Sequence, residues 1–232
     1  MEPEIIDLAN CLNKMGAKIE GAGTNVIKIV GVKKLKDISY TVMPDRIEAG
    51  TLLCMTAITG GKVQLNHVIP EHISPIINKL EECGCKIEQG KDYVFLDAPK
   101  KLKAVDIKTM PYPGFPTDMQ SVFVGMLTTA KGTSIVIENI FENRYKYIPE
   151  LKRMGAKATV EGRTAVINGV RKLSGTTVKS TDLRGGAALI TAGLVAKGRT
   201  KVTNAEYILR GYENLDEKLR KLGANIILEE GE

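Results

Sequence analysis

The residues best suited to chemistry lie in one proline-rich stretch, Pro111-Tyr112-Pro113-Gly114-Phe115-Pro116-Thr117-Asp118. Its prolines fix φ and its glycine frees it, so we expect a rigid, shaped loop. The apolar residues 122–127 come next and predict a helix that begins near Thr117. A stiff loop at a helix start can aim the Asp118 carboxylate at a substrate. An aspartate there is also an ordinary capping residue, and the spacing alone favours capping.

Three segments are apolar nearly all round and predict helices that are buried on every side: 49–58, 121–130 and 186–196. An aspartate precedes each of them, namely Asp45, Asp118 and Asp182. In a threefold arrangement the helix N-termini would meet at one end of the domain. Their aligned dipoles would make that end suitable for an anionic ligand.

Arginines are expected at the same end because of their positions in the sequence: Arg46, Arg144, Arg184 and Arg210. The guanidinium group is well suited to forked recognition of a carboxylate or phosphate. A solvated or locally paired arginine is the alternative for each of them, because surface arginines are common.

An internal repeat sets the architecture. A surface helix that ends at a glycine and is followed by a strand recurs at Gly16, Gly84, Gly155 and Gly223, in steps of 68, 71 and 68 residues. We predict an α/β (α+β) fold of three pseudo-threefold repeats, 45–117, 118–181 and 182–232, with buried helices inside and sheets outside. Residues 1–44 contain only a surface helix, a strand and a hairpin. We expect that a strand from this segment, either 26–32 or 38–42, completes the truncated third repeat.

Composition excludes several classes. The chain has 232 residues and a formal net charge of +6, a mild preference for anionic partners. It has no basic stripe or stacking motif, so a nucleic-acid partner is not expected. Cys54 lies in an apolar run and predicts a buried thiol, and Cys83-Gly84-Cys85 lacks zinc-site spacing, so no metal is expected. The longest apolar run is too short to cross a membrane, and we expect a cytoplasmic protein.

Four motifs occur in a fixed order: the loop ending at Asp118, Phe141-Glu142-Asn143-Arg144, Thr181-Asp182-Leu183-Arg184, and Arg210-Gly211-Tyr212-Glu213. In this respect the chain resembles the enolpyruvyl transferase family, and within it the UDP-N-acetylglucosamine 1-carboxyvinyltransferases. These bacterial enzymes transfer enolpyruvate from phosphoenolpyruvate to UDP-N-acetylglucosamine in the first committed step of peptidoglycan synthesis. The family has two inside-out α/β barrels with the active site between them, and no cofactor is implied.

The resemblance also implies roles for individual residues. Asp118 would take the proton from the sugar 3′-hydroxyl as general base. Arg184 and the catalytic Arg210 would hold phosphoenolpyruvate or the charge that passes through the cleft. The implied substrate-binding residues are Arg46, Asp118, Ile140, Arg144, Asp182, Arg184 and Arg210. Among these, Ile140 would line the nucleotide-sugar site and Asp182 would position the arginines.

Segments of the family's N-terminal barrel have no match here, including its loop with the reactive cysteine. The chain resembles the C-terminal barrel, 45–232, preceded by the last helix and hairpin of the N-terminal barrel, 1–44. We therefore expect it to be inactive without the missing barrel and capable of self-association through the surface left uncovered. Two alternatives are a non-catalytic UDP-N-acetylglucosamine-binding module and a 5-enolpyruvylshikimate-3-phosphate synthase. The Asp118 loop and the Phe141 motif favour the nucleotide-sugar branch.

Overall fold

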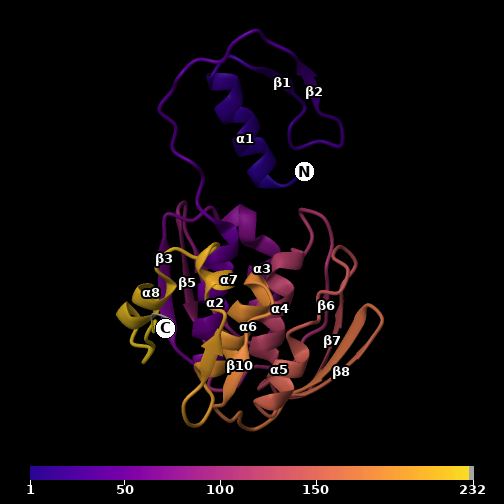
Figure 1. The fold of residues 1–232 in the computed structure, drawn as a ribbon, viewed down its shortest axis with the longest axis vertical. Helices are drawn as coiled ribbons and strands as arrows, with labels where there is room; N and C mark the ends of the chain where they lie inside the picture. The colour runs from indigo at the N-terminus through magenta and orange to yellow at the C-terminus, as the bar shows by residue number, and fades with distance from the viewer. Residues whose placement is uncertain (230–232) are drawn as a thin grey trace.

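Three helices form the centre of the computed structural model, which describes residues 1–229. They are α2 (Arg46–Thr59), α4 (Thr117–Leu127) and α6 (Leu183–Gly193), and most of their residues are buried. Figure 1 shows them side by side with the sheets around them. The prediction of an α/β fold with buried helices inside and sheets outside is confirmed.

Small residues let the central helices approach closely. A Cβ atom on Gly125 of α4 would lie only 2.6 Å from the carbonyl oxygen of Ala188 in α6. A Cβ atom on Gly50 of α2 would lie 3.0 Å from the sulfur of Met119. Glycine at these positions therefore sets the helix separation, since the obstacle at Gly125 is backbone and cannot turn aside.

Three sheets cover the central helices. The first has the order β3-β5-β4, the second β6-β7-β9-β8, and the third pairs β10 with β11. Their bounds are β3 Lys62–Asn66, β4 Lys86–Gln89, β5 Tyr93–Asp97, β6 Ile107–Lys108, β7 Thr133–Ile137, β8 Lys157–Glu161, β9 Thr164–Asn168, β10 Thr177–Lys179 and β11 Lys201–Thr203. On β5 and β9 the burial alternates, as it does in a strand with one face on a core.

The first two units each share a strand with the unit that follows. The short strand β6 pairs in parallel with β7, and β10 pairs in parallel with β11, so each of these two units contributes its last strand to the next sheet. The sequence pattern did not predict this exchange. Its consequence is that the loop between β6 and α4 is anchored to two units at once, which fixes the approach to Asp118.

The surface helices end as the repeat predicted. The helices that end at the repeat glycines are α1 (Pro3–Lys14), α3 (Ser74–Glu82, preceded by the 3-10 turn Pro70–Ile73), α5 (Ile148–Arg153) and α8 (Leu215–Lys221). A further short helix, α7 (Glu206–Leu209), ends at Arg210 instead. All four repeat glycines are left-handed, with φ between +93° and +103°. A strand follows the first three glycines, whereas residues 224–229 form none.

The N-terminal segment stands apart from the sheets. It contains α1 (Pro3–Lys14), β1 (Lys18–Glu20) and β2 (Lys28–Val30), and it lies at the end of the barrel where α2 begins (Figure 1). The β1–β2 hairpin pairs only with itself, so it does not complete the third sheet as expected. Residues 31–44, which include the alternative candidate 38–42, form no strand. In residues 1–229 no helix combines the length and apolarity needed to span a membrane.

Candidate functional site

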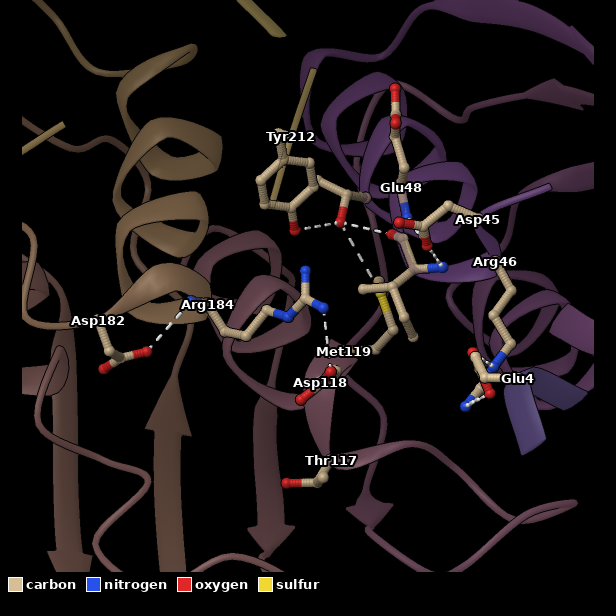
Figure 2. Close-up of polar contacts among 12 residues, drawn as sticks. Glu4, Asp45, Arg46, Glu48, Thr117, Asp118, Met119, Asp182, Arg184 and Tyr212 are labelled. Atoms are coloured by element: carbon tan, nitrogen blue, oxygen red, sulfur yellow. Dashed lines mark hydrogen bonds and ion pairs between the residues drawn. The ribbon is translucent and has the colours of Figure 1, made fainter. Parts of the chain in front are cut away.

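Asp118 binds two arginines and does not cap its helix. The N-cap of α4 is Pro116, and no side chain caps this helix end. One carboxylate oxygen of Asp118 accepts a hydrogen bond from Arg144 Nη2 at 2.7 Å, and the other accepts one from Arg184 Nη2 at 3.0 Å. Figure 2 shows Arg184 extending from the start of α6 towards Asp118. A carboxylate held between two guanidinium groups is the central feature of this site.

The other two aspartates show what capping looks like in this fold. Asp45 accepts hydrogen bonds from the backbone amides of Ile47 and Glu48. Asp182 accepts them from the amides of Arg184 and Gly185 at 3.1 and 2.9 Å. The capping interpretation therefore holds for Asp45 and Asp182 and is wrong for Asp118. Through its cap, Asp182 fixes the turn that carries Arg184.

The carboxylate faces solvent while its partners lie behind it. The side chain of Asp118 is 41% exposed, against 8% for Arg144 and 13% for Arg184. Partial burial raises the pKa of the Asp118 carboxyl, but the charges of Arg184 and Arg144 outweigh burial and hold the pKa below its usual value. Two cations and one anion leave the cluster with a net positive charge, which attracts a second anion.

Each arginine is oriented by an aromatic ring. The Arg144 guanidinium lies 4.9 Å from the ring centre of Phe141, and that of Arg184 lies 5.5 Å from the ring centre of Tyr212. Tyr212 is buried, and its hydroxyl lies 2.9 Å from Thr51 Oγ1 of α2. Within residues 1–229, Arg144 Nε and Arg184 Nη1 are buried nitrogens without an acceptor.

Glu138, directly after β7, is a positioning residue that was not among the predicted ones. Its side chain is buried and accepts four hydrogen bonds. The donors are Thr109 Oγ1 at 2.7 Å, Thr117 Oγ1 at 3.0 Å, and the amides of Ile140 and Phe141 at 2.9 and 3.0 Å. One carboxylate thus ties the start of α4 to the loop that carries Arg144. The sequence held one signal, a charged residue directly after the apolar run Ile135-Val136-Ile137.

Arg46 is paired within the chain. Its Nε and Nη2 donate to the Glu4 carboxylate of α1 at 2.7 and 3.3 Å, and its guanidinium lies 5.6 Å from the ring centre of Tyr112. Figure 2 shows this pair apart from Asp118. The local-pairing alternative therefore describes Arg46, which ties the N-terminal segment to the barrel.

Two further predicted residues are not joined to the Asp118 side chain by any hydrogen bond or ion pair within residues 1–229. Arg210 is exposed at the end of α7, with its guanidinium 6.0 Å from the ring centre of Tyr207. Ile140 is 45% exposed on the loop held by Glu138. The structure thus brings together Asp118, Arg144 and Arg184, and it leaves Arg210 and Ile140 free to meet a ligand from the solvent side.

Comparisons with known proteins identify the family of this chain. The family model described as EPSP synthase (3-phosphoshikimate 1-carboxyvinyltransferase) matches residues 1–219. A UDP-N-acetylglucosamine 1-carboxyvinyltransferase 1 from Caldanaerobacter subterraneus subsp. tengcongensis is 57% identical over 97% of this chain and 54% of its own length. A UDP-N-acetylglucosamine 1-carboxyvinyltransferase from Desulfofundulus thermocisternus is 56% identical over 95% of this chain and 91% of its own length.

Solved structures show the same fold. The enolpyruvyl transferase NikO from Streptomyces tendae has a TM-score of 0.84 and 28% identity, over 97% of this chain and 54% of its own. An EPSP synthase from Acinetobacter baumannii has a TM-score of 0.72 and 20% identity, over 96% of this chain and 55% of its own, and supports the fold alone. The chain spans about half the length of most of the curated relatives it matches. By its sequence and its fold, this chain belongs to the enolpyruvyl transferase family, the family of EPSP synthase.

Proposed function

We propose that this chain forms one half of a transferase that moves enolpyruvate from phosphoenolpyruvate to the 3′-hydroxyl of UDP-N-acetylglucosamine. The observation that carries the proposal is the pairing of Asp118 with Arg144 and Arg184 at the joint N-terminal end of α4 and α6. The relatives at 52–57% identity carry that enzyme's name, which favours it over the shikimate-pathway alternative. Its substrates are metabolites of the cytoplasm, where we expect it to act.

The proposed chemistry follows from the charges. Without substrate, the two arginines hold the pKa of Asp118 below its usual value, which makes the carboxylate a weak base. An anionic substrate that draws a guanidinium away raises the basicity of Asp118. The carboxylate then takes the proton of the sugar hydroxyl while the hydroxyl oxygen bonds to C2 of phosphoenolpyruvate and C3 gains a proton from an acid of the other barrel. Loss of a C3 proton together with the phosphate then restores the double bond. Substrate binding itself thereby activates the base.

The remaining residues have supporting roles in this proposal. Arg184 and Arg210 bind phosphoenolpyruvate or its leaving phosphate, and Ile140 contacts the nucleotide sugar from its exposed loop. Asp182 fixes Arg184 through its cap. The substrate-binding role has the least support for Arg46, because its guanidinium already forms an ion pair with Glu4.

We propose further that a second barrel supplies the rest of the active site. The N-terminal segment exposes apolar side chains, including Val26 and Ile29 at 68% each and Val42 at 72%. Such a surface suits docking against the remainder of an N-terminal barrel or, failing that, self-association. A missing oxyanion-type donor costs about 10²–10³ in rate, so the chain alone should turn over many orders of magnitude more slowly.

Calorimetry and a phosphate-release assay test the proposal. We expect the chain to bind UDP-N-acetylglucosamine measurably, to lose most of that binding in Asp118→Asn, and to keep it in the exposed control Asp92→Asn. We expect phosphate release from phosphoenolpyruvate only when a separately expressed N-terminal barrel is added. Binding without turnover in that mixture would favour the non-catalytic module, and equal binding by both variants would refute the role of Asp118.

A further inference from the structure

A second basic site lies at the opposite end of the central helices. A cavity of about 180 Å³ opens between the ends of α2, α4 and α6, where Ala57, Thr129 and Val195 line it. A helix rises about 1.5 Å per residue, so the far end of α4 is roughly 16 Å from Asp118. The cavity is therefore separate from the candidate site, and its ligand is independent of the proposed function.

Two loops that occupy equivalent places in successive units bring four cations to this cavity. They are Pro99-Lys100-Lys101-Leu102 after β5 and Val170-Arg171-Lys172-Leu173 after β9. In each loop the leucine is buried and anchors an exposed basic pair. None of the four cations has an ion-pair partner within residues 1–229, and no carboxylate lines the cavity. The charge there is uncompensated by side chains.

The backbone of both loops also offers donors. The carbonyl oxygens of Leu102 and Leu173 accept hydrogen bonds from the amides of Lys131 and Lys197 at 2.7 and 2.9 Å, which fixes the loops in place. The amides of residues 100–102 and 171–173 have no acceptor within the described part of the chain. Successive free amides beside basic side chains are a recurrent way to bind an anion.

Helix dipoles offset only part of the positive charge. Each helix C-terminus carries about −0.5 of an elementary charge, so three of them supply about −1.5 against the four cations. A net charge of about +2.5 therefore remains, which matches a dianion or trianion better than a single carboxylate. The volume is below the roughly 300–1,000 Å³ of pockets that enclose a drug-sized ligand, so the site suits a compact group.

We propose that this cavity binds a compact polyanion of the diphosphate class. Lys100, Lys101, Arg171 and Lys172 supply the charge, and the free amides of the two loops direct it. The Thr129 side chain adds a hydroxyl at the end of α4.

Titration with inorganic pyrophosphate at constant ionic strength, followed by amide chemical shifts, tests the proposal. We expect saturable shifts in residues 100–102 and 171–173 and one binding event that maps to this end of the barrel. The double variant Lys101→Gln/Arg171→Gln should weaken that event at least tenfold. The matched control Lys91→Gln/Lys157→Gln removes two exposed lysines elsewhere and should leave it unchanged.

Three results would overturn the proposal. The first is the absence of saturable shifts in these two loops. The second is an equal loss of affinity in the two double variants, which would show a response to net charge. The third is unchanged affinity in Lys101→Gln/Arg171→Gln. In each case the basic pairs serve only to offset the helix dipoles. Because the shifts are read from the unmodified chain first, misfolding of a variant would not obscure the answer.

Discussion

Replacing Glu138 should destabilise the barrel and loosen the site together. Its buried carboxylate accepts from the hydroxyls of Thr109 and Thr117 and from the amides of Ile140 and Phe141. A hydrogen bond to a charged group contributes about 1.5–3 kcal/mol, but the contributions do not add. Ile140 and Phe141 are exposed, so water can replace the acceptor at their amides. The two threonine hydroxyls are the donors that lose most.

We therefore expect Glu138→Ala to lower the free energy of unfolding by about 2–4 kcal/mol. This is less than the sum of the lost hydrogen bonds, because the variant no longer has to bury a charge. Glu138→Gln should cost about 1–2 kcal/mol. Its amide oxygen keeps the three donors that now contact one carboxylate oxygen, and its amide nitrogen faces only Thr117. Urea unfolding with a constant m-value measures both changes.

A matched control is Glu161→Ala, because Glu161 is an exposed carboxylate at the end of β8, an edge strand of the same sheet. It should stay within about 0.5 kcal/mol of the unmodified chain. A Glu138→Ala variant as stable as that control would refute the structural role of Glu138. A Glu138→Gln variant as damaged as Glu138→Ala would also refute it, because the retained acceptor would then be irrelevant. Affinity for UDP-N-acetylglucosamine gives a second measurement of the Ile140 loop.

Two substitutions and one labelling experiment test other parts of the structure. The lowered pKa of Asp118 means that its ionised form stabilises the fold above the unfolded-state pKa of about 3.9, and that this contribution disappears as pH falls through the folded-state pKa. Asp118→Asn should thus be less stable than the unmodified chain at pH 7, with a gap that closes on acidification in urea unfolding; a constant gap would contradict this. Gly125→Ala should lower the free energy of unfolding by about 1–3 kcal/mol, because the added Cβ atom would meet the Ala188 carbonyl oxygen. The control Gly193→Ala in α6 would make only ordinary contacts and should leave the free energy of unfolding unchanged. Burial raises the pKa of the Cys83 thiol to about 12 and that of Cys85 to about 11, so native protein at pH 8 should show one fast thiol, Cys11, with a thiol reagent; rapid reaction of three or four would contradict the buried core.

Much of the fold could be predicted from local patterns. The periodic glycines indicated the repeat because a left-handed residue is needed wherever a surface helix turns into a strand, and Gly16, Gly84, Gly155 and Gly223 all adopt it. Uniformly apolar helices had to be central because no face of them suits water. Parallel pairing of β6 with β7 and of β10 with β11 was not predictable, since strands of two or three residues carry no pattern that names a partner.

The candidate site, like the fold, was only partly predictable from the sequence. Sequence order selected Asp118, Arg144 and Arg184 as candidates, together with Arg46 and Arg210. It could not tell a capping aspartate from a free one, because that depends on whether the backbone at Asp118 presents amides or guanidinium groups to the carboxylate. Nor could the sequence show that Arg46 pairs with Glu4, since α1 and α2 come together only in the folded chain.

The sequence by itself therefore determined the repeat, the burial of its helices, the motifs and the family that they indicate. These are properties of neighbouring residues and of their order. Only the tertiary structure decided which charges meet. It paired Asp118 with two arginines from later segments, assigned Glu138 a buried role, and gathered two distant basic pairs around one cavity. Electrostatic and hydrogen-bond energies depend on distances of a few ångströms, and folding alone sets those distances for residues far apart in the chain.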